Sequence, residues 1–172
     1  MLSGKRTFIL ITTLMMFGGC SHYYVPDAST FKLDAIKEFS SSNSISILNA
    51  QTSTKNVLLA TNMGHRFYGN LQSWTETAIT ITQRELINRG MKIEKDVPKI
   101  LNLSIESAEG TFGAWVLRFE ITLKVETGDG YVQTYLGDNR SPATLYRAAD
   151  GAVMRAVAEM LKDEHIIAYL VN

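Results

Sequence analysis

Cysteine, proline and long apolar runs are scarce in this chain of 172 residues, which has one cysteine and three prolines. With Cys20 alone no internal disulfide can form, so we expect the fold to be held together by its core. The apolar run from Thr7 to Phe17 is shorter than the roughly 20 residues that a membrane-spanning helix needs.

The chain also lacks an excess of positive charge. It has 17 basic and 17 acidic residues, and Lys5 and Arg6 are the only charges among residues 1–19. Without that segment 15 basic residues (17 − 2) face 17 acidic ones, a net charge of about −2. Nucleic-acid binders carry a clustered basic surplus, so we expect no nucleic-acid partner.

Residue patterns typical of catalysis are absent as well. The three histidines, His22, His65 and His165, are far apart in the sequence, and none lies at metal-ligand spacing from another. The segments 64–66 and 110–113 lack the length and the lysine of a phosphate-binding loop. The sequence therefore predicts no enzyme, no metal site and no cofactor.

What the chain does have is a distinctive first segment. Two basic residues precede the apolar run, and the small residues Gly18 and Gly19 lead directly to Cys20. A positive start, a short apolar run and small residues before a cleavage point are typical of a secretory signal. Polar and aromatic residues follow Cys20, so nothing extends the run into a stop-transfer helix.

The placement of Cys20 resembles the lipobox of bacterial lipoproteins, although Phe17 stands where that family usually has leucine. The resemblance implies cleavage after residue 19 and acylation of Cys20, which would attach the protein to a membrane. Ser21, in place of the aspartate that retains such proteins in the inner membrane, implies the periplasmic face of the outer membrane of a Gram-negative bacterium. The alternative is an ordinary cleaved signal with an incidental cysteine, and a lone cysteine at this position favours the lipoprotein.

The rest of the chain divides into a tether and one domain. Residues 20–43 contain Pro26, Asp27 and the run Ser40–Asn43, which are typical of linkers. We expect the first part of this tether to be mobile and the second part, with a weak apolar pattern from Phe31 to Phe39, to dock loosely. Residues 44–172 are predicted to form a single domain.

Hydrophobic periodicity predicts alternating strands and helices in this domain. A helix over 71–89 is expected to end at Gly90 and to pack Trp74 and Leu86 against a sheet. A second helix is expected to begin with Ser141 as its N-cap and Pro142 in its first turn. The predicted strands are 44–50, 101–106, 115–126 and 131–136, and a last short helix is capped by Asp163.

Alternation is cleanest from Trp115 to Glu126, where Trp115, Phe119 and their alternate neighbours are predicted to face the core. The opposite positions are mostly charged, as in an antiparallel sheet covered on one side. We expect hairpin turns at 127–130 and 109–113. The predicted fold is therefore α+β, a two-layer sandwich of about four mostly antiparallel strands with two helices on one face.

Asp138, Arg140, Tyr131 and Tyr135 are candidates for an interaction surface. Asp138 and Arg140 lie where the last strand is expected to turn into the helix, a place where a ligand can meet backbone N–H groups. Tyr131 and Tyr135 could present an exposed aromatic patch to a partner. An ordinary turn is favoured for the first pair, and packing in the core for the tyrosines, because tyrosine often buries its ring and leaves its hydroxyl wet.

The Trp74 helix ending at Arg89-Gly90, the strand 114–126 and the alanine-rich helix 145–161 together resemble the YajG-type family of Gram-negative lipoproteins. The two-layer plan also resembles the N-terminal domain of TolB and the lipoproteins that activate penicillin-binding proteins. These resemblances imply a non-enzymatic envelope module that binds another envelope protein. Alternatives are an auxiliary subunit of a transport or assembly machine, a lipid-binding lipoprotein and, most remotely, a cell-wall enzyme.

Overall fold

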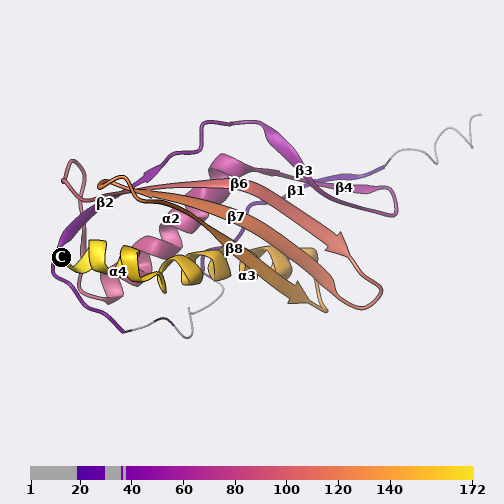
Figure 1. The fold of residues 1–172 in the computed structure, drawn as a ribbon. Helices are drawn as coiled ribbons and strands as arrows, with labels where there is room; N and C mark the ends of the chain where they lie inside the picture. Colours follow the sequence, from indigo (N-terminus) through magenta and orange to yellow (C-terminus); the bar gives the residue numbers. More distant parts are fainter. Residues whose placement is uncertain (1–18, 30–35, 37) are drawn as a thin grey trace, which may run out of the picture.

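The computed structural model describes residues 19–29, 36 and 38–172. The described residues form an α+β fold with three helices, α2 (Leu71–Asn88), α3 (Leu145–Met160) and α4 (Glu164–Val171) (Figure 1). Their strands are β1 (Ser21–Tyr23), β2 (Ser44–Asn49), β3 (Asn56–Asn62), β4 (His65–Asn70), β5 (Lys92–Ile93), β6 (Ile100–Phe112), β7 (Leu117–Thr127) and β8 (Val132–Ser141). The predicted fold class is confirmed.

The larger sheet has five strands in the order β5-β2-β6-β7-β8. β6, β7 and β8 pair antiparallel, as predicted. β2, however, runs parallel to both β5 and β6, because the chain between β2 and these strands crosses over through α2, as parallel neighbours require. Figure 1 shows α2 and α3 on one face of this sheet, as expected for the two-layer plan.

A second sheet, in the order β1-β4-β3, was not predicted. β3 and β4 form a hairpin, and β1 adds to β4 in parallel. The two-residue turn Met63-Gly64 has positive φ at both residues, 46° and 82°, as a tight hairpin turn of the primed type requires.

α2 matches the prediction closely. Asn70 caps its start by accepting from the Ser73 N–H at 3.1 Å, and the chain leaves it at Gly90 with a φ of 86°. Trp74 and Leu86 are fully buried. Its threonines donate their hydroxyls to carbonyls four residues earlier, so their polar groups are satisfied inside the helix.

α3 begins later than predicted. Ser141 is not its N-cap, because β8 stays paired with β7 up to the pair Leu117–Ser141. The helix starts at Leu145, and the Thr144 hydroxyl accepts from the Arg147 N–H at 3.1 Å. Asp163 does cap α4 as expected, since its carboxylate accepts from the N–H groups of His165 and Ile166, the second and third residues of the helix.

The predicted inward orientation of Trp115 is wrong. β6 continues to Phe112, so the hairpin turn comprises residues 113–116 and not 109–113. Trp115 lies in this turn and is 89% exposed, whereas Phe119, inside β7, is fully buried. The alternation in the sequence extends beyond the strand into the turn, which is why it misplaced Trp115.

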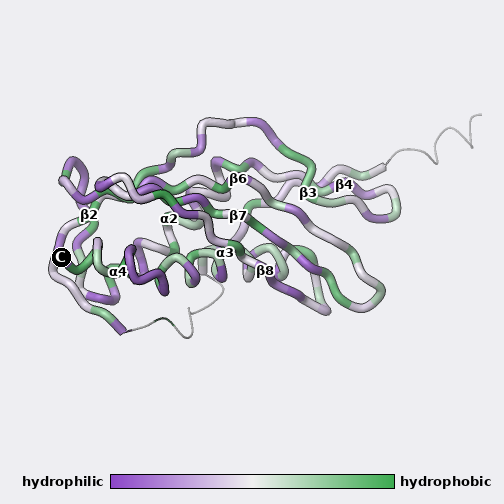
Figure 2. The backbone as a smooth tube through the Cα atoms, in the orientation of Figure 1, coloured by the Kyte–Doolittle hydropathy of each residue, from purple (hydrophilic) through white to green (hydrophobic). Residues whose placement is uncertain are grey.

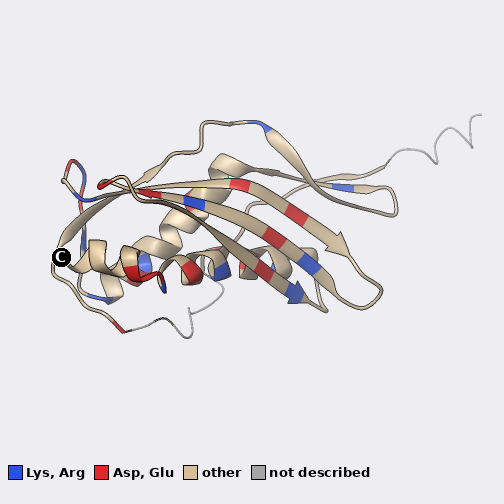
Figure 3. Ribbon diagram, in the orientation of Figure 1, with Lys and Arg blue, Asp and Glu red and all other residues tan. Residues whose placement is uncertain are grey.

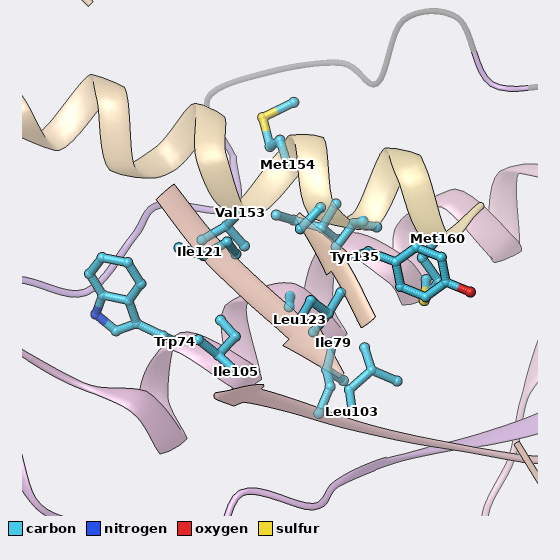
Figure 4. Close-up of a cluster of buried hydrophobic side chains, with 14 of the residues drawn as sticks. Trp74, Ile79, Leu103, Ile105, Ile121, Leu123, Tyr135, Val153, Met154 and Met160 are labelled. Atoms are coloured by element: carbon cyan, nitrogen blue, oxygen red, sulfur yellow. The ribbon is translucent and has the colours of Figure 1, made fainter. Parts of the chain in front are cut away.

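The core lies between the large sheet and the helices. Figure 4 shows side chains of β6 and β7, among them Ile105, Ile121 and Leu123, together with Trp74 of α2 and Val153 of α3. The predicted interlayer packing of α2 and α3 against this apolar face is therefore confirmed.

Candidate functional site

Cys20 lies beside the turn of the β3–β4 hairpin. Its thiol is free and exposed. Its carbonyl accepts from the Arg66 N–H at 2.9 Å, and Gly19 lies so close to the carbonyl of Gly64 that a side chain at position 19 would collide with it. The chain is thus attached to the domain at Cys20.

β1 also brings together two histidines that are 43 residues apart in the sequence. His22 Nε2 and His65 Nδ1 are 2.9 Å apart, and the His22 ring stacks on Phe67 at 4.9 Å between centroids. Because the two nitrogens share a hydrogen bond, one ring donates while the other accepts. No spacing rule could have found this pair, since it depends on the parallel pairing of β1 with β4.

The residues after β1 form an extended strap, residues 24–28, that runs along α2 and α3. Its alternate carbonyls accept from side chains of α2. The three bonds join Trp74 Nε1 to the Tyr24 oxygen at 2.9 Å, Thr77 Oγ1 to the Pro26 oxygen at 3.0 Å, and Arg84 Nη1 to the Ala28 oxygen at 2.6 Å. The predicted mobility of this part of the tether is therefore wrong.

Asp150 of α3 holds the strap from its other side. One carboxylate oxygen accepts both from the Tyr24 hydroxyl and from the Asp27 N–H, the latter at 3.0 Å. Asp150 is only 5% exposed. Burial raises its pKa above the ordinary range, against the lowering effect of the Tyr24 hydrogen bond, and burial together with Asp150 raises the pKa of Tyr24.

Replacing Asp150 by alanine is expected to release the strap. The change leaves two donors without their acceptor, and a hydrogen bond to a charged group is worth about 1.5–3 kcal/mol. The Asp27 amide should exchange with deuterium faster, while the core of β7 stays protected. The matched control is Glu159→Ala, at an exposed ion pair on the same helix. Unchanged exchange at Asp27 would show that Asp150 does not hold the strap.

The same variant has a pH signature. The pKa of Asp150 is raised in the folded protein. The proton on Asp150 therefore stabilises the fold fully when the pH is below the pKa of aspartate in the unfolded chain, about 3.9. This stabilisation is lost as the pH rises through the pKa that Asp150 has in the folded protein. The wild type should therefore lose stability across this interval relative to Asp150→Ala in denaturant titrations at several pH values. Parallel pH curves would contradict the assignment.

The second part of the predicted tether is described only in places. Phe39 is partly buried against the core, and Arg89 lies over its ring at 5.1 Å. Ile36 also packs against the core. The remaining residues of the weak apolar pattern, 31–35 and 37, lie outside the described residues.

Two members of the candidate interaction surface serve the fold. Tyr131 and Tyr135 both donate their hydroxyls to Asp163 Oδ2 at 2.9 Å, which ties β8 and the residue before it to the N-cap of α4. Tyr135 is only 7% exposed, and burial and Asp163 raise its pKa. Its ring therefore offers nothing to a partner, whereas the half-buried Tyr131 stacks on His165 at 3.9 Å.

The other two members, Asp138 and Arg140, are residues of β8 and not of a turn before α3. In the register with β7, Asp138 faces Glu120 and Arg140 faces Arg118, so like charges are opposed. Arg118 compensates by binding both oxygens of Asp138 at 2.9 Å and Glu120 at 2.9 Å. These bonds lower the pKa of Asp138. Figure 3 shows charged bands on β6, β7 and β8.

The described residues contain no group of three or more His, Cys, Asp or Glu side chains that could hold a metal ion. A hollow of about 330 Å³ lies beside β2 and β5 and is lined in part by Glu94, Lys95 and Asp96. Buried side chains of the helices and the larger sheet form one hydrophobic cluster. In the described part of the chain, no helix has the length and apolar character to span a membrane.

No protein-family model matches this chain, and no curated protein is similar to it. The resemblance to YajG-type lipoproteins therefore stays a prediction, and the role of Cys20 and its surroundings must be inferred from their chemistry.

Proposed function

We propose that the protein is a lipoprotein acylated at Cys20 and held at the periplasmic face of a Gram-negative outer membrane. There it acts as a non-enzymatic module that binds another envelope protein. The observation that carries this proposal is the only cysteine of the chain, placed directly after a positive, apolar and small-residue segment. An anchor of several acyl chains, at about 0.8 kcal/mol per buried CH₂, is sufficient for stable attachment.

The surroundings of Cys20 support this role. Its thiol is exposed, so a modifying enzyme and a bilayer can reach it. The domain begins within one residue of it, at Ser21 of β1.

A surface for a protein partner is available at the edge of the larger sheet. Among the described strands β8 pairs with β7 alone, and an open strand edge can accept a strand from another protein. Arg140 is exposed near the end of this edge, beside the Arg118–Asp138 pair. An auxiliary subunit of a transport or assembly machine would use the same edge for a defined partner.

Cys20→Ser is expected to abolish palmitate labelling and to release the protein from membrane pellets, because serine offers no thiol for acylation. The companion variant Ser21→Asp should keep the label and move the protein from the outer-membrane to the inner-membrane fraction in sucrose gradients. A Cys20→Ser protein that is still labelled and still pellets would refute the lipid anchor.

The partner itself is sought by crosslinking the acylated protein in membranes, with mass spectrometry of what co-purifies. A single stoichiometric envelope protein, lost when a charge such as Arg140→Glu is placed on the β8 edge, supports the module. Recovery of bound lipid without a protein would instead favour lipid binding.

A further inference from the structure

We propose that the turns of two hairpins, Met63 in β3–β4 and Trp115 in β6–β7, insert into the phospholipid bilayer that holds the acyl chains of Cys20. This inference rests on the proposed lipid anchor and goes beyond it. It assigns a membrane-contacting end to the domain, with Met63 and Trp115 as the two residues that enter the lipid.

Met63 and Trp115 are the most exposed large apolar side chains of the described residues, at 94% and 89%. A soluble domain gains nothing from exposing a whole indole or a whole methionine side chain at a turn. Polar residues and glycine are the usual choice at turns. Both side chains are therefore candidates for burial against something outside the domain.

Met63 is also unfavourable for the turn it occupies. A φ of 46° is uncommon for residues other than glycine, asparagine and aspartate, and Asn-Gly is the preferred pair for such a turn. Local turn chemistry does not account for methionine here. An apolar contact beyond the turn does.

The turn that holds Trp115 lies in a segment without charged side chains. Residues 110–117 contain no charged side chain, and the turn closes through a hydrogen bond from the Gly113 N–H to the Val116 carbonyl at 3.0 Å. Figure 2 shows this turn as hydrophobic, and Figure 3 shows it without charge. Tryptophan favours the boundary between lipid headgroups and acyl chains, because its ring is apolar and its N–H is polar.

The position of Cys20 identifies the bilayer as the occupant. The parallel pairing of Ser21 with Arg66 places Cys20 and Gly19 beside the Met63-Gly64 turn. In Figure 1 both hairpin turns project from the end of the molecule where residue 19 lies. Acyl chains on Cys20 would therefore bring Met63 to the membrane without any movement of the domain.

The two hairpins are held together below their turns. Phe67 of β4 packs on Phe112 of β6, with ring centroids 5.6 Å apart. Phe112 is the last paired residue before the β6–β7 turn, opposite Leu117. The exposed Arg66 of β4 provides a cation for lipid phosphates at this end. The two hairpin turns therefore form one joined surface, because the Phe67–Phe112 contact connects their hairpins.

The test uses the acylated protein with a single environment-sensitive fluorophore at Trp115→Cys, reconstituted into vesicles of phosphatidylethanolamine and phosphatidylglycerol. Acylation blocks the Cys20 thiol, so the new cysteine alone reacts. The control is Lys95→Cys, an exposed position before the start of β6. β6 has 13 residues, which places this control about 40 Å from the Trp115 turn along the strand.

The label at position 115 is expected to shift its emission to shorter wavelength and to lose most of its quenching by iodide, while the label at position 95 keeps both water-like values. Adding Met63→Asn should return part of the emission shift without weakening the turn. If the acylated protein floats with the vesicles but both labels stay equally accessible to iodide, the inference is wrong and the anchor stands.

Two further outcomes separate the remaining alternatives. If the protein isolated from membranes carries no acyl groups and does not float with vesicles, the proposed lipid anchor is wrong, and the inference falls with it. A label at position 115 that is protected in native membranes but accessible in pure lipid vesicles assigns this end to a protein partner, which also overturns insertion into lipid.

Discussion

Phe119→Ala is expected to lower the free energy of unfolding by about 3–5 kcal/mol, the cost of removing a buried aromatic ring. Phe119, near the start of β7, is fully buried. Its ring lies against that of Trp74, with 5.3 Å between centroids, so the cavity would open between β7 and α2. The helix and the sheet could close this cavity only by moving as whole elements. We therefore expect the full loss of unfolding free energy.

The matched control is Trp115→Ala, four residues earlier on the same hairpin. Trp115 is exposed, and surface substitutions usually change stability by less than about 0.5 kcal/mol. Urea titrations of the protein without residues 1–19 should separate the two variants clearly. Equal losses at both positions would mean that the hairpin turns elsewhere and that Trp115 packs in the core.

Gly137→Ala, a change of one methyl group, is expected to lower the free energy of unfolding by about 3 kcal/mol, the upper end for overpacked cores. A methyl group on Gly137 of β8 would collide with the backbone carbonyl of Ala152 and lie 2.9 Å from the Ala156 N. Both atoms belong to the backbone of α3, so no side chain can rotate away. The helix would have to lift off the sheet.

Leu136→Ala is the control for this prediction. Leu136 is the neighbour of Gly137 on β8 but points to the opposite face of the sheet and is 57% exposed. Its truncation should leave the thermal midpoint nearly unchanged, whereas Gly137→Ala should lower it by several degrees. A normal midpoint for Gly137→Ala would show that α3 is not in backbone contact with β8.

Elements with a strong local signal could be predicted from the sequence. The Trp74 helix has a regular apolar stripe and a glycine at its end, and both were found where expected. The glycine-containing turn at 127–130 was also correct, since β7 ends at Thr127. The fold class follows from the order of these elements and needs no knowledge of long-range pairing.

The errors share a physical cause, which is that pairing over long distances has no local signature. β1 has three residues and becomes a strand only because β4, more than 40 residues later, offers its edge. The extent of β6 and β8 is likewise set by β7 lying between them. Alternation in a single strand therefore gave the correct face for Phe119 but could not place the turn before it.

The candidate site was predictable only in part. Cys20 has a signal in the residues before it, so it could be singled out. The strap could not, because its three bonds to α2 join main-chain carbonyls to side chains, and carbonyls are the same at every residue. Tyr131 and Tyr135 share a partner only because Asp163, the N-cap of α4, accepts from both hydroxyls.

The pairing of β1 directly after Cys20 limits how far this domain can search for a partner. A free linker of 24 residues would have a root-mean-square span of about 25–30 Å. If Cys20 is acylated, residues 21–28 cannot act as a free linker, because they are bound to the domain. The domain then stays directly at the surface of the bilayer. A protein partner of this domain must therefore reach the membrane surface or be embedded in the bilayer.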